Sequence, residues 1–330
     1  MRGMLCVAAC VPRLEPAMIR PIHSRARLIF GAILLFAAAG VLHAQATGGA
    51  SAIAPPPPAA PSSRGLVLVE LFTSEGCPHC PDADALLERL YTEQSVEGAV
   101  IVPLEEHVDY WDRREWVDHF SSAGFTQRQK SYADALDVDS VYTPQMIVDG
   151  LVEFVGNNEA RARATIAALG HAAITPLRFE PVEPRPAQSP PKDGAQVHLQ
   201  GEGLALAGPA VVYLALAEDK LLSQVGGGSN AGETWRHSSV ARWFYSVGKL
   251  APGEKTFSAG LTLPAPDPQW RVENLRLIAI VQEEESRKVA GLGVARWTEV
   301  VGPPKPVPAA AGPVSTRPAV TSNASGHAMP

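Results

Sequence analysis

The stretch GLVLVELFTSEGCPHC, residues 65–80, decides how the first half of the chain is expected to fold. It begins with an apolar, β-branched run of strand length, and residues 82–91 (DADALLERLY) follow with leucines at helical spacing. Cys77 and Cys80, two of the four cysteines in the chain, lie where the strand gives way to the helix. The sequence therefore predicts a strand, a two-cysteine loop and a helix, in that order.

The rest of the first region continues this alternation of strands and helices. Because a strand, a helix and a second strand follow one another, we expect a right-handed parallel crossover. Asp149-Gly150, between two apolar runs, is typical of a tight hairpin turn. The predicted elements are strands at 99–104, 142–148 and 151–155, one or two helices within 111–136, and a last helix at 159–169.

The second region, residues 195–301, has a different pattern. Its short apolar or alternating runs are typical of antiparallel β-structure, and they predict a β-rich, sandwich-like domain with one short helix within 238–247. Asn230, Arg236 and His237 lie in a Gly-rich turn, where we expect turn or interdomain contacts. The predicted strands are 196–200, 210–218, 255–263, 275–283 and 289–297.

The N-terminus has the pattern of a secretory signal peptide. Residues 28–42 are uncharged and apolar, arginines precede them, and Ala44-Gln45-Ala46 offers a cleavage site. A retained anchor is the alternative, but the stretch is shorter than the roughly 20 apolar residues of a membrane span. We expect an exported protein, periplasmic or secreted, whose translation begins at Met1, Met4 or Met18.

Proline-rich segments set the remaining boundaries. Stretches rich in proline and alanine cannot bury a core and are typical of linkers and tails. The predicted organisation is a signal peptide at 1–46, a linker at 47–64, an α/β domain at 65–175, a linker at 176–194, a β-rich domain at 195–301 and a disordered tail at 302–330.

Cleavage of the signal peptide changes both the charge and the cysteine content. Five arginines and one glutamate leave with it, so the exported chain is more acidic than the full chain with its net charge of −6. We therefore expect no nucleic-acid partner and no stable membrane insertion after cleavage. Cys6 and Cys10 also leave, so Cys77 and Cys80 have only each other as partners.

The Cys-Pro-His-Cys sequence predicts thiol chemistry. A thiol at the start of a helix faces free backbone N–H groups and the positive end of the helix dipole, which favour the thiolate. We expect Cys77 to be the exposed nucleophile and Cys80 the resolving thiol. His79 would lower the pKa of Cys77 further, whereas Glu75 opposes this effect. This redox chemistry requires no bound cofactor and no metal.

Other uses of the cysteine pair stay open. The alternative function is a periplasmic copper-type metal-binding protein or metallochaperone, in which His79, His107 or Met146 would assist the thiolates. A structural disulfide is a further possibility. A zinc site would need a second pair of ligands at regular spacing, which the sequence lacks.

Thr143-Pro144 opens the third predicted strand. Proline there removes a ladder hydrogen bond unless it lies at the strand start or follows a cis bond. A cis proline opposite the helix start would leave Thr143 free to pair with an extended thiol-bearing peptide, and an ordinary trans proline is the alternative. Residues 107–120 either line a substrate groove or form an amphipathic cover helix. The expected substrate-binding residues are Thr143, Pro144, His79 and His107.

Taken together, the motifs resemble the thioredoxin superfamily. The resemblance lies in VLVELFTSEGCPHC (67–80) followed by VYTPQMIVDG (141–150). The chain most resembles a family of bacterial exported thioredoxin-like proteins of unassigned function. The shared segments, which extend over nearly all of residues 65–297, are ELFTSEGCPHCPDADALL, HVDYWDRREWVDHF, FTQRQKSYA, VYTPQMIVDG and SNAGETWRHSSV.

The resemblance implies an α/β thioredoxin-like fold with a helical insertion, followed by a smaller β-rich, sandwich-like domain. It implies that Cys77 attacks, that Cys80 is its buried partner, that Pro144 is cis, and that Glu70 carries a proton to and from the second thiol. The dipeptide between the cysteines resembles that of the periplasmic oxidant DsbA. The implied function is an exported thiol–disulfide oxidoreductase that exchanges with thiol- or disulfide-bearing proteins and with an unknown redox partner.

Overall fold

A computed structural model describes residues 64–182 and 195–302, which belong to one unit. The predicted signal peptide, most of the two linkers and nearly all of the predicted tail lie outside the described residues. Within those residues, no helix has the length and apolar character needed to cross a membrane.

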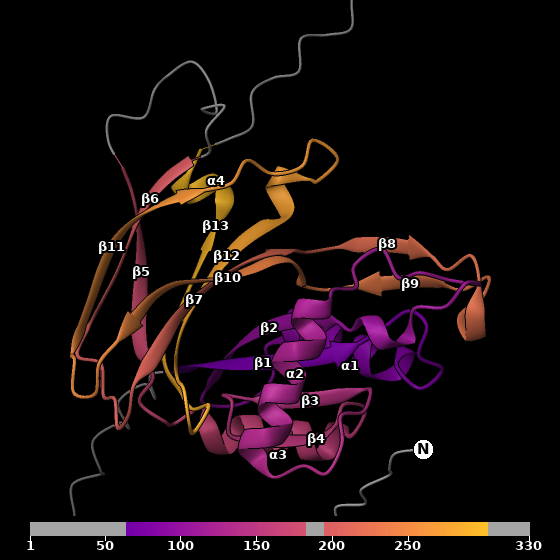
Figure 1. Ribbon diagram of the computed structural model, residues 1–330, viewed down its shortest axis with the longest axis horizontal. Coiled ribbons are helices and arrows are strands. Elements are labelled where there is room, and N and C mark those ends of the chain that lie inside the picture. The colour runs from indigo at the N-terminus through magenta and orange to yellow at the C-terminus, as the bar shows by residue number, and fades with distance from the viewer. Residues whose placement is uncertain (1–63, 183–194, 303–330) are drawn as a thin grey trace, which may run out of the picture. The chain divides into compact units, whose positions relative to one another are not determined.

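One mixed sheet of eleven strands organises the described chain, in the order β11-β6-β5-β13-β12-β7-β10-β2-β1-β3-β4 (Figure 1). Its strands are β1 (Gly65–Thr73), β2 (Ala99–His107), β3 (Gln145–Val148), β4 (Val152–Val155), β5 (Thr175–Pro181), β6 (Ala195–Glu202), β7 (Ala210–Glu218), β10 (Val240–Leu250), β11 (Thr256–Leu263), β12 (Leu275–Glu283) and β13 (Val289–Arg296). A separate two-stranded sheet holds β8 (Leu221–Gln224) and β9 (Thr234–His237).

The helices are fewer than the strands. The α-helices of the described chain are α1 (Pro81–Glu93), α2 (Ala123–Leu136), α3 (Glu159–Leu169) and α4 (Trp297–Val300). Three short 3₁₀ helices accompany them: η1 (Asp109–Trp111), η2 (Gly228–Asn230) and η3 (Val272–Asn274).

This architecture corrects the predicted fold. We expected an α/β thioredoxin-like domain with a helical insertion and a separate sandwich-like domain, and this expectation is wrong. β10 pairs in parallel with β2, with Val240 opposite Glu105, so strands from both regions form one mostly β structure. The physical reason is that β2 would otherwise present an unpaired edge, and the periodicity of a strand does not reveal which distant strand covers its edge.

Elements with a clear pattern are nevertheless where the sequence predicted them. They include β1, α1, β2, β3, β4 and α3 in the first region, and β6, β7, β11, β12 and β13 in the second. The short helix expected within 238–247 is instead β10, whose aromatic residues Trp243, Phe244 and Tyr245 suit a strand. Part of the predicted linker 176–194 lies in β5, which pairs with β6 and β13.

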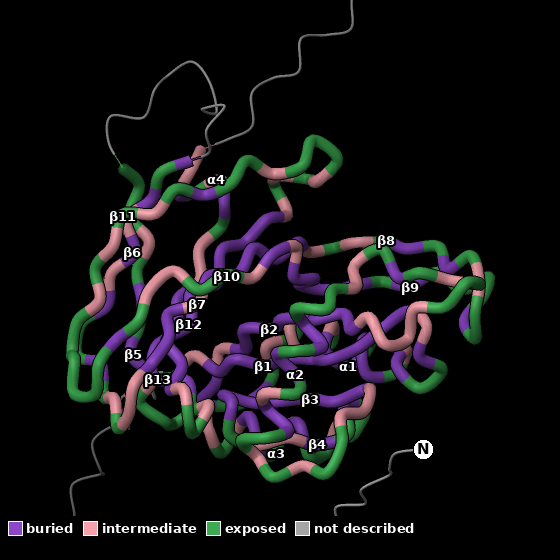
Figure 2. Tube along the Cα trace, in the orientation of Figure 1, coloured by how far each residue is buried: buried purple, intermediate pink, exposed green. Residues whose placement is uncertain are grey.

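The central strands bury both faces of the sheet, as Figure 2 shows for β1, β2, β7 and β12. Because successive side chains of a strand point to opposite faces, β1 contributes to two apolar clusters. Val67, Val69 and Leu71 pack with α1 and α3, whereas Leu68 packs on the other face with residues of β7 and β12. This burial on both faces holds the start of α1 firmly against the end of β1.

A buried ion pair fastens α2 to the sheet. Glu70 is fully buried on the same face as Leu68, and the Nε of Arg128 donates to its Oε1 at 2.7 Å. Arg128 also lies 3.2 Å from Glu106 on β2 and donates to Gln282 on β12 at 3.1 Å. Burial opposes the charge on Arg128, but Glu70 outweighs this and raises the pKa of Arg128 above its ordinary value.

We expect Arg128→Met to destabilise the protein by about 3–5 kcal/mol, because it leaves the buried carboxylate of Glu70 without its cation. The free energy of unfolding in urea would measure the loss. Arg163→Met is the matched control, because Arg163 pairs with Glu159 on the surface of α3 and its removal should change stability little. Equal losses in both variants would contradict this account of the buried network.

Asp149 is expected to make stability depend on pH. It lies in the predicted turn, with φ at 50°, and its Oδ1 accepts from the backbone N–H of Leu68 at 2.8 Å. Burial raises its pKa from 3.8 to about 7. The folded state therefore keeps a proton that the unfolded chain loses, so stability should fall as the pH rises from about 4 to about 7.

Asp149→Asn should remove this fall, since an amide keeps the acceptor oxygen and tolerates the positive φ. Urea unfolding at a series of pH values measures the slope. Asp137→Asn is the control, because Asp137 has a similar φ of 55° but is exposed. If the slope between pH 4 and 7 is the same in Asp149→Asn as in the natural chain, the assignment to Asp149 is wrong.

Candidate functional site

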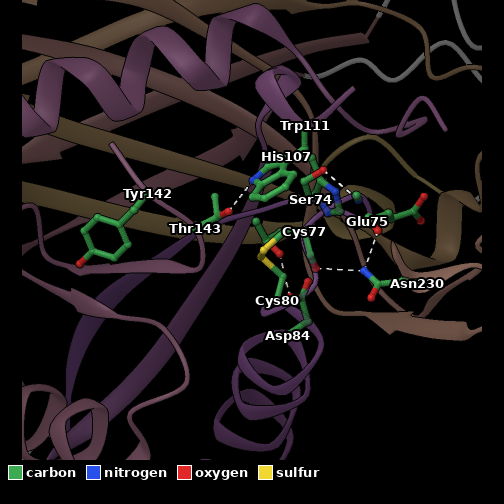
Figure 3. Close-up of a disulfide and its surroundings, with 12 residues drawn as sticks. Ser74, Glu75, Cys77, Cys80, Asp84, His107, Trp111, Tyr142, Thr143 and Asn230 are labelled. Atoms are coloured by element: carbon green, nitrogen blue, oxygen red, sulfur yellow. Dashed lines mark hydrogen bonds between the residues drawn. A yellow bond between two sulfur atoms is a disulfide. The ribbon is translucent and has the colours of Figure 1, made fainter. Parts of the chain in front are cut away.

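The two cysteines lie in the loop between β1 and α1 and form a disulfide, with their Cα atoms 5.5 Å apart (Figure 3). Cys80 is the N-cap of α1, and Pro81 occupies the first helical position, where the missing N–H of proline has no cost. Pro78 and His79, between the cysteines, are exposed. The tip of the loop therefore faces solvent while its sulfur atoms lie underneath.

The burial of Cys77 differs from the prediction. We expected Cys77 to be exposed, but both cysteines are 0% exposed. Four side chains, which we call the disulfide cover, pack with them: Trp111, Trp116, Val225 and Trp235. The cover has two sources, because its first two residues come from the segment after β2 and the other two from the segment around β8 and β9.

Residues 107–120 supply the first half of the cover. Of the two alternatives for this segment, a substrate groove or an amphipathic cover helix, the helix does not form. The segment contains η1, and a short bridge joins Arg113 to Trp116. The indole Nε1 of Trp116 donates to Oε2 of Glu75 at 3.1 Å. The indole Nε1 of Trp111 donates to Oγ1 of Thr143 at 2.7 Å (Figure 3). The two tryptophans are thus held in place over the cysteine loop by hydrogen bonds.

The second half of the cover belongs to residues 221–237, which we call the arm. In Figure 1 the arm continues from β7 and β10 and reaches over the start of α1. The side-chain amide of Asn230 donates to the carbonyl oxygens of Glu75 at 2.8 Å and Cys77 at 2.9 Å. Gly227 lies so close to the carbonyl oxygen of Glu115 that any side chain there would collide with it.

The other predicted site residues divide into those near the disulfide and those away from it. The Thr143-Pro144 bond is cis, as predicted, and Thr143 meets the cover through Trp111. Glu70 lies elsewhere. Its neighbours in β1 face α1, so its own side chain points to the opposite face of the sheet, where Arg128 and Tyr132 donate hydrogen bonds to its carboxylate. The structure does not bring Glu70 to the cysteines.

His107 belongs to a buried polar cluster rather than to an open groove. It is fully buried with Asp84 of α1, Glu105 of β2 and His237 at the end of β9. One potential ligand atom from each lies within 4.8 Å of the others, and in the described chain they are the group suited to a metal ion. Neither cysteine belongs to it, so these donors gather beside the disulfide and not on it.

Outer carboxylates surround this cluster. Asp118 lies 2.7 Å from Nδ1 of His107, and Glu75 lies 3.4 Å from Nε2 of His237. Burial opposes the charged form of His107, but Asp118 outweighs it and raises the pKa of His107 to about 9. The pKa of His237 is likewise raised by its carboxylates against the effect of burial, and burial raises the pKa of Asp84.

Several of these residues were not predicted from the sequence as members of a site. A local signal existed for Asp84, one helical turn after Cys80, and for Glu105, two positions before His107 and so on the same face of β2. No such signal existed for His237 and Asn230, which we expected to make turn or interdomain contacts. They do contact the first region, but their position over the cysteine loop depends on the arm.

A pocket of about 470 Å³ lies apart from the disulfide. It is bounded by the start of α2 and by β10, and no residue of the disulfide cover lines it. Its lining includes His119, Phe120, Arg128, Arg242, Phe244 and Trp270. The cysteine pair is therefore covered by packed side chains and does not open into this pocket.

Solved structures with a similar fold include the following two. A protein from Agrobacterium tumefaciens, whose X-ray crystal structure comes from a structural genomics consortium, is 25% identical, with a TM-score of 0.53 and coverage of 73% of this chain and 96% of that one. HBP35 of Porphyromonas gingivalis is 13% identical, with a TM-score of 0.52 and coverage of 79% and 81%, which is a likeness of fold alone. No curated protein matches the chain.

The family match corrects the family membership that was predicted from the sequence. Residues 68–282 match a family described as "Protein of unknown function (DUF1223)". None of the comparisons supports the thioredoxin superfamily, so the expected membership of an exported thioredoxin-like family is wrong. Because the match spans more than half of the chain, this protein is a member of the DUF1223 family.

Proposed function

We propose that the protein is a thiol–disulfide oxidoreductase in which Cys77 and Cys80 alternate between a disulfide and two thiols. The observation that carries the proposal is the pairing of these cysteines in a loop that opens α1. A thiolate at this position is stabilised by the helix dipole and by the free N–H groups of the first turn. Export to the periplasm, where such exchange occurs, is part of the same proposal.

Several acidic side chains near the loop oppose a thiolate, and their charges are partly offset. Glu75 is fully buried, and Asp82 and Asp84 lie in the first turn of α1. His237 lies 3.4 Å from Glu75 and 3.7 Å from Asp84, so its positive charge reduces their field. The helix dipole therefore acts in surroundings that the buried imidazole makes less negative.

Exchange requires the disulfide cover to open. A partner thiolate must approach a sulfur atom along the S–S axis, and both cysteines are fully buried. The two hydrogen bonds of Asn230 hold the arm on the loop, while exposed Pro78 and His79 offer a partner its first contact. We infer that the arm lifts before each exchange, which restricts the reaction to partners that hold it open.

The chemical step conserves atoms and electrons. A partner thiolate attacks the sulfur of Cys77, forms a mixed disulfide and releases Cys80 as a thiolate. The second partner thiol then loses its proton and attacks the mixed disulfide, which leaves the partner oxidised and both cysteines reduced by two electrons and two protons. The reverse sequence, in which Cys77 attacks and Cys80 resolves, reduces a partner disulfide. Substrates are therefore proteins that carry a dithiol or a disulfide.

We expect the natural chain to equilibrate between disulfide and dithiol in glutathione buffers and to speed thiol–disulfide exchange in a reduced model protein. Cys80→Ser should accumulate a mixed disulfide through Cys77, because the resolving thiol is missing. Cys77→Ser and the double variant Cys77→Ser/Cys80→Ser are the controls. Thiol alkylation followed by mass spectrometry measures the rate of exchange. If the natural chain exchanges no faster than the double variant, the proposal is refuted.

Asn230→Ala should raise the rate at which dithiothreitol reduces the disulfide. Loss of two hydrogen bonds worth roughly 1 kcal/mol each favours the lifted arm, so the rate should rise roughly 30-fold. Gln224→Ala is the matched control, because Gln224 lies in the same arm but binds only other arm residues. Equal rates in Asn230→Ala and the natural chain would show that the arm does not limit access.

A further inference from the structure

The buried polar cluster beside the disulfide contains four potential ligands of one metal ion. They are Asp84, Glu105, His107 and His237, and they come from α1, β2 and β9. All four are buried, and their donor atoms lie within 4.8 Å of one another. Two imidazoles and two carboxylates are a common ligand set for divalent transition metals.

The donor atoms that face the centre of this cluster make no hydrogen bonds. They are Oδ1 of Asp84, Oε2 of Glu105, Nε2 of His107 and Nδ1 of His237. Nδ1 of His237 lies 3.3 Å from Glu105 and 3.7 Å from Asp84, and Nε2 of His107 lies 3.8 Å from Glu105. Buried polar atoms are nearly always satisfied, so four such atoms around one point indicate a ligand for all of them.

The opposite nitrogen of each imidazole faces a carboxylate outside the cluster. Nδ1 of His107 lies 2.7 Å from Asp118, and Nε2 of His237 lies 3.4 Å from Glu75. In metal sites, such a carboxylate fixes the tautomer of the histidine and directs its free nitrogen at the ion. His107 makes a hydrogen bond of this kind, whereas Nε2 of His237 faces Glu75 without one. The orientation of the His107 ring is an independent observation that points to a metal as the ligand.

The charge of the cluster also calls for a cation. Four carboxylates, those of Asp84, Glu105, Asp118 and Glu75, meet at this place, and in the described chain their ion pairs are with His107 and His237 alone. Four ionised carboxylates need positive charge close by, and two protonated imidazoles would supply two units of it. A divalent ion supplies the same two units in their place and lets the imidazoles bind as neutral ligands.

We propose that Asp84, Glu105, His107 and His237 bind one divalent transition-metal ion, Zn²⁺ or an ion of similar ligand preference, in a tetrahedral site. Ligand atoms about 2.0–2.1 Å from zinc lie about 3.4 Å apart, close to the shorter separations in the cluster. Four protein ligands and full burial make this a closed, structural site. The ion would fasten the end of the arm to α1 and β2, directly beside the cysteine loop.

Calorimetric titration of the chelator-treated full chain with ZnCl₂ tests the site. We expect one ion per chain, with binding more than about 100-fold weaker in His237→Gln and in Glu105→Gln. Asp118→Asn, which removes an outer carboxylate, should weaken binding by about 10–100-fold. His198→Gln, which removes a surface histidine of β6, is the control and should bind like the natural chain. Equal affinity in all variants would overturn the proposal.

Zinc X-ray absorption of the natural chain keeps the test valid even where a variant fails to fold. The expected spectrum has a nitrogen and oxygen shell with the scattering of two imidazoles, and a sulfur ligand would overturn the proposed site. Cys77→Ser/Cys80→Ser should bind Zn²⁺ with unchanged affinity, because neither cysteine is a ligand. This variant therefore tests the metal site independently of thiol–disulfide exchange. A strong loss of Zn²⁺ binding in the double variant would show that the cysteines are ligands and would overturn the proposed site.

Discussion

The pairing of β2 with β10 is the constraint on which the rest of the site depends. The backbone N–H of Glu105 donates to the carbonyl oxygen of Ser239 at 2.9 Å, and Val240 lies opposite Glu105. Ser239 has a φ of 71°, and its hydroxyl both donates to Pro103 and accepts from Arg276 at 2.7 Å. The arm ends at His237, two residues before Ser239. This junction therefore holds the end of the arm beside the cysteine loop.

Glu105 connects this junction to the buried polar cluster. Its Oε1 accepts from the backbone N–H of Ser238 at 2.9 Å, while its Oε2 faces the imidazoles of His107 and His237. One side chain therefore joins the root of the arm to the proposed metal ligands. Any ligand of the cluster and any movement of the arm act on the same carboxylate, so the two proposed activities share a physical link while resting on different atoms.

The sequence predicted the parts of the fold and the site that depend on neighbouring residues. The apolar run before Cys77, the leucines after Cys80 and the turn at Asp149 have local causes, and the structure confirms the strand, the helix and the turn. The single sheet could not be predicted in this way, because the periodicity of a strand does not determine which distant strand pairs with it. The resemblance to thioredoxins likewise rested on local motifs, which do not determine how two halves of a chain join.

The exposure of Cys77 was wrong for the same reason. A loop between a strand and a helix is normally open, and the side chains that close this one include Val225 and Trp235, far along the chain.

The distance along the chain between the cysteines and the arm also means that they are synthesised at different times. Asn230 follows Cys77 by 153 residues, so at ordinary rates of synthesis the arm appears roughly 10–30 s after the cysteines. During that interval the thiols are exposed to any oxidant that surrounds the nascent chain, so the first oxidation of the pair does not require the arm to open.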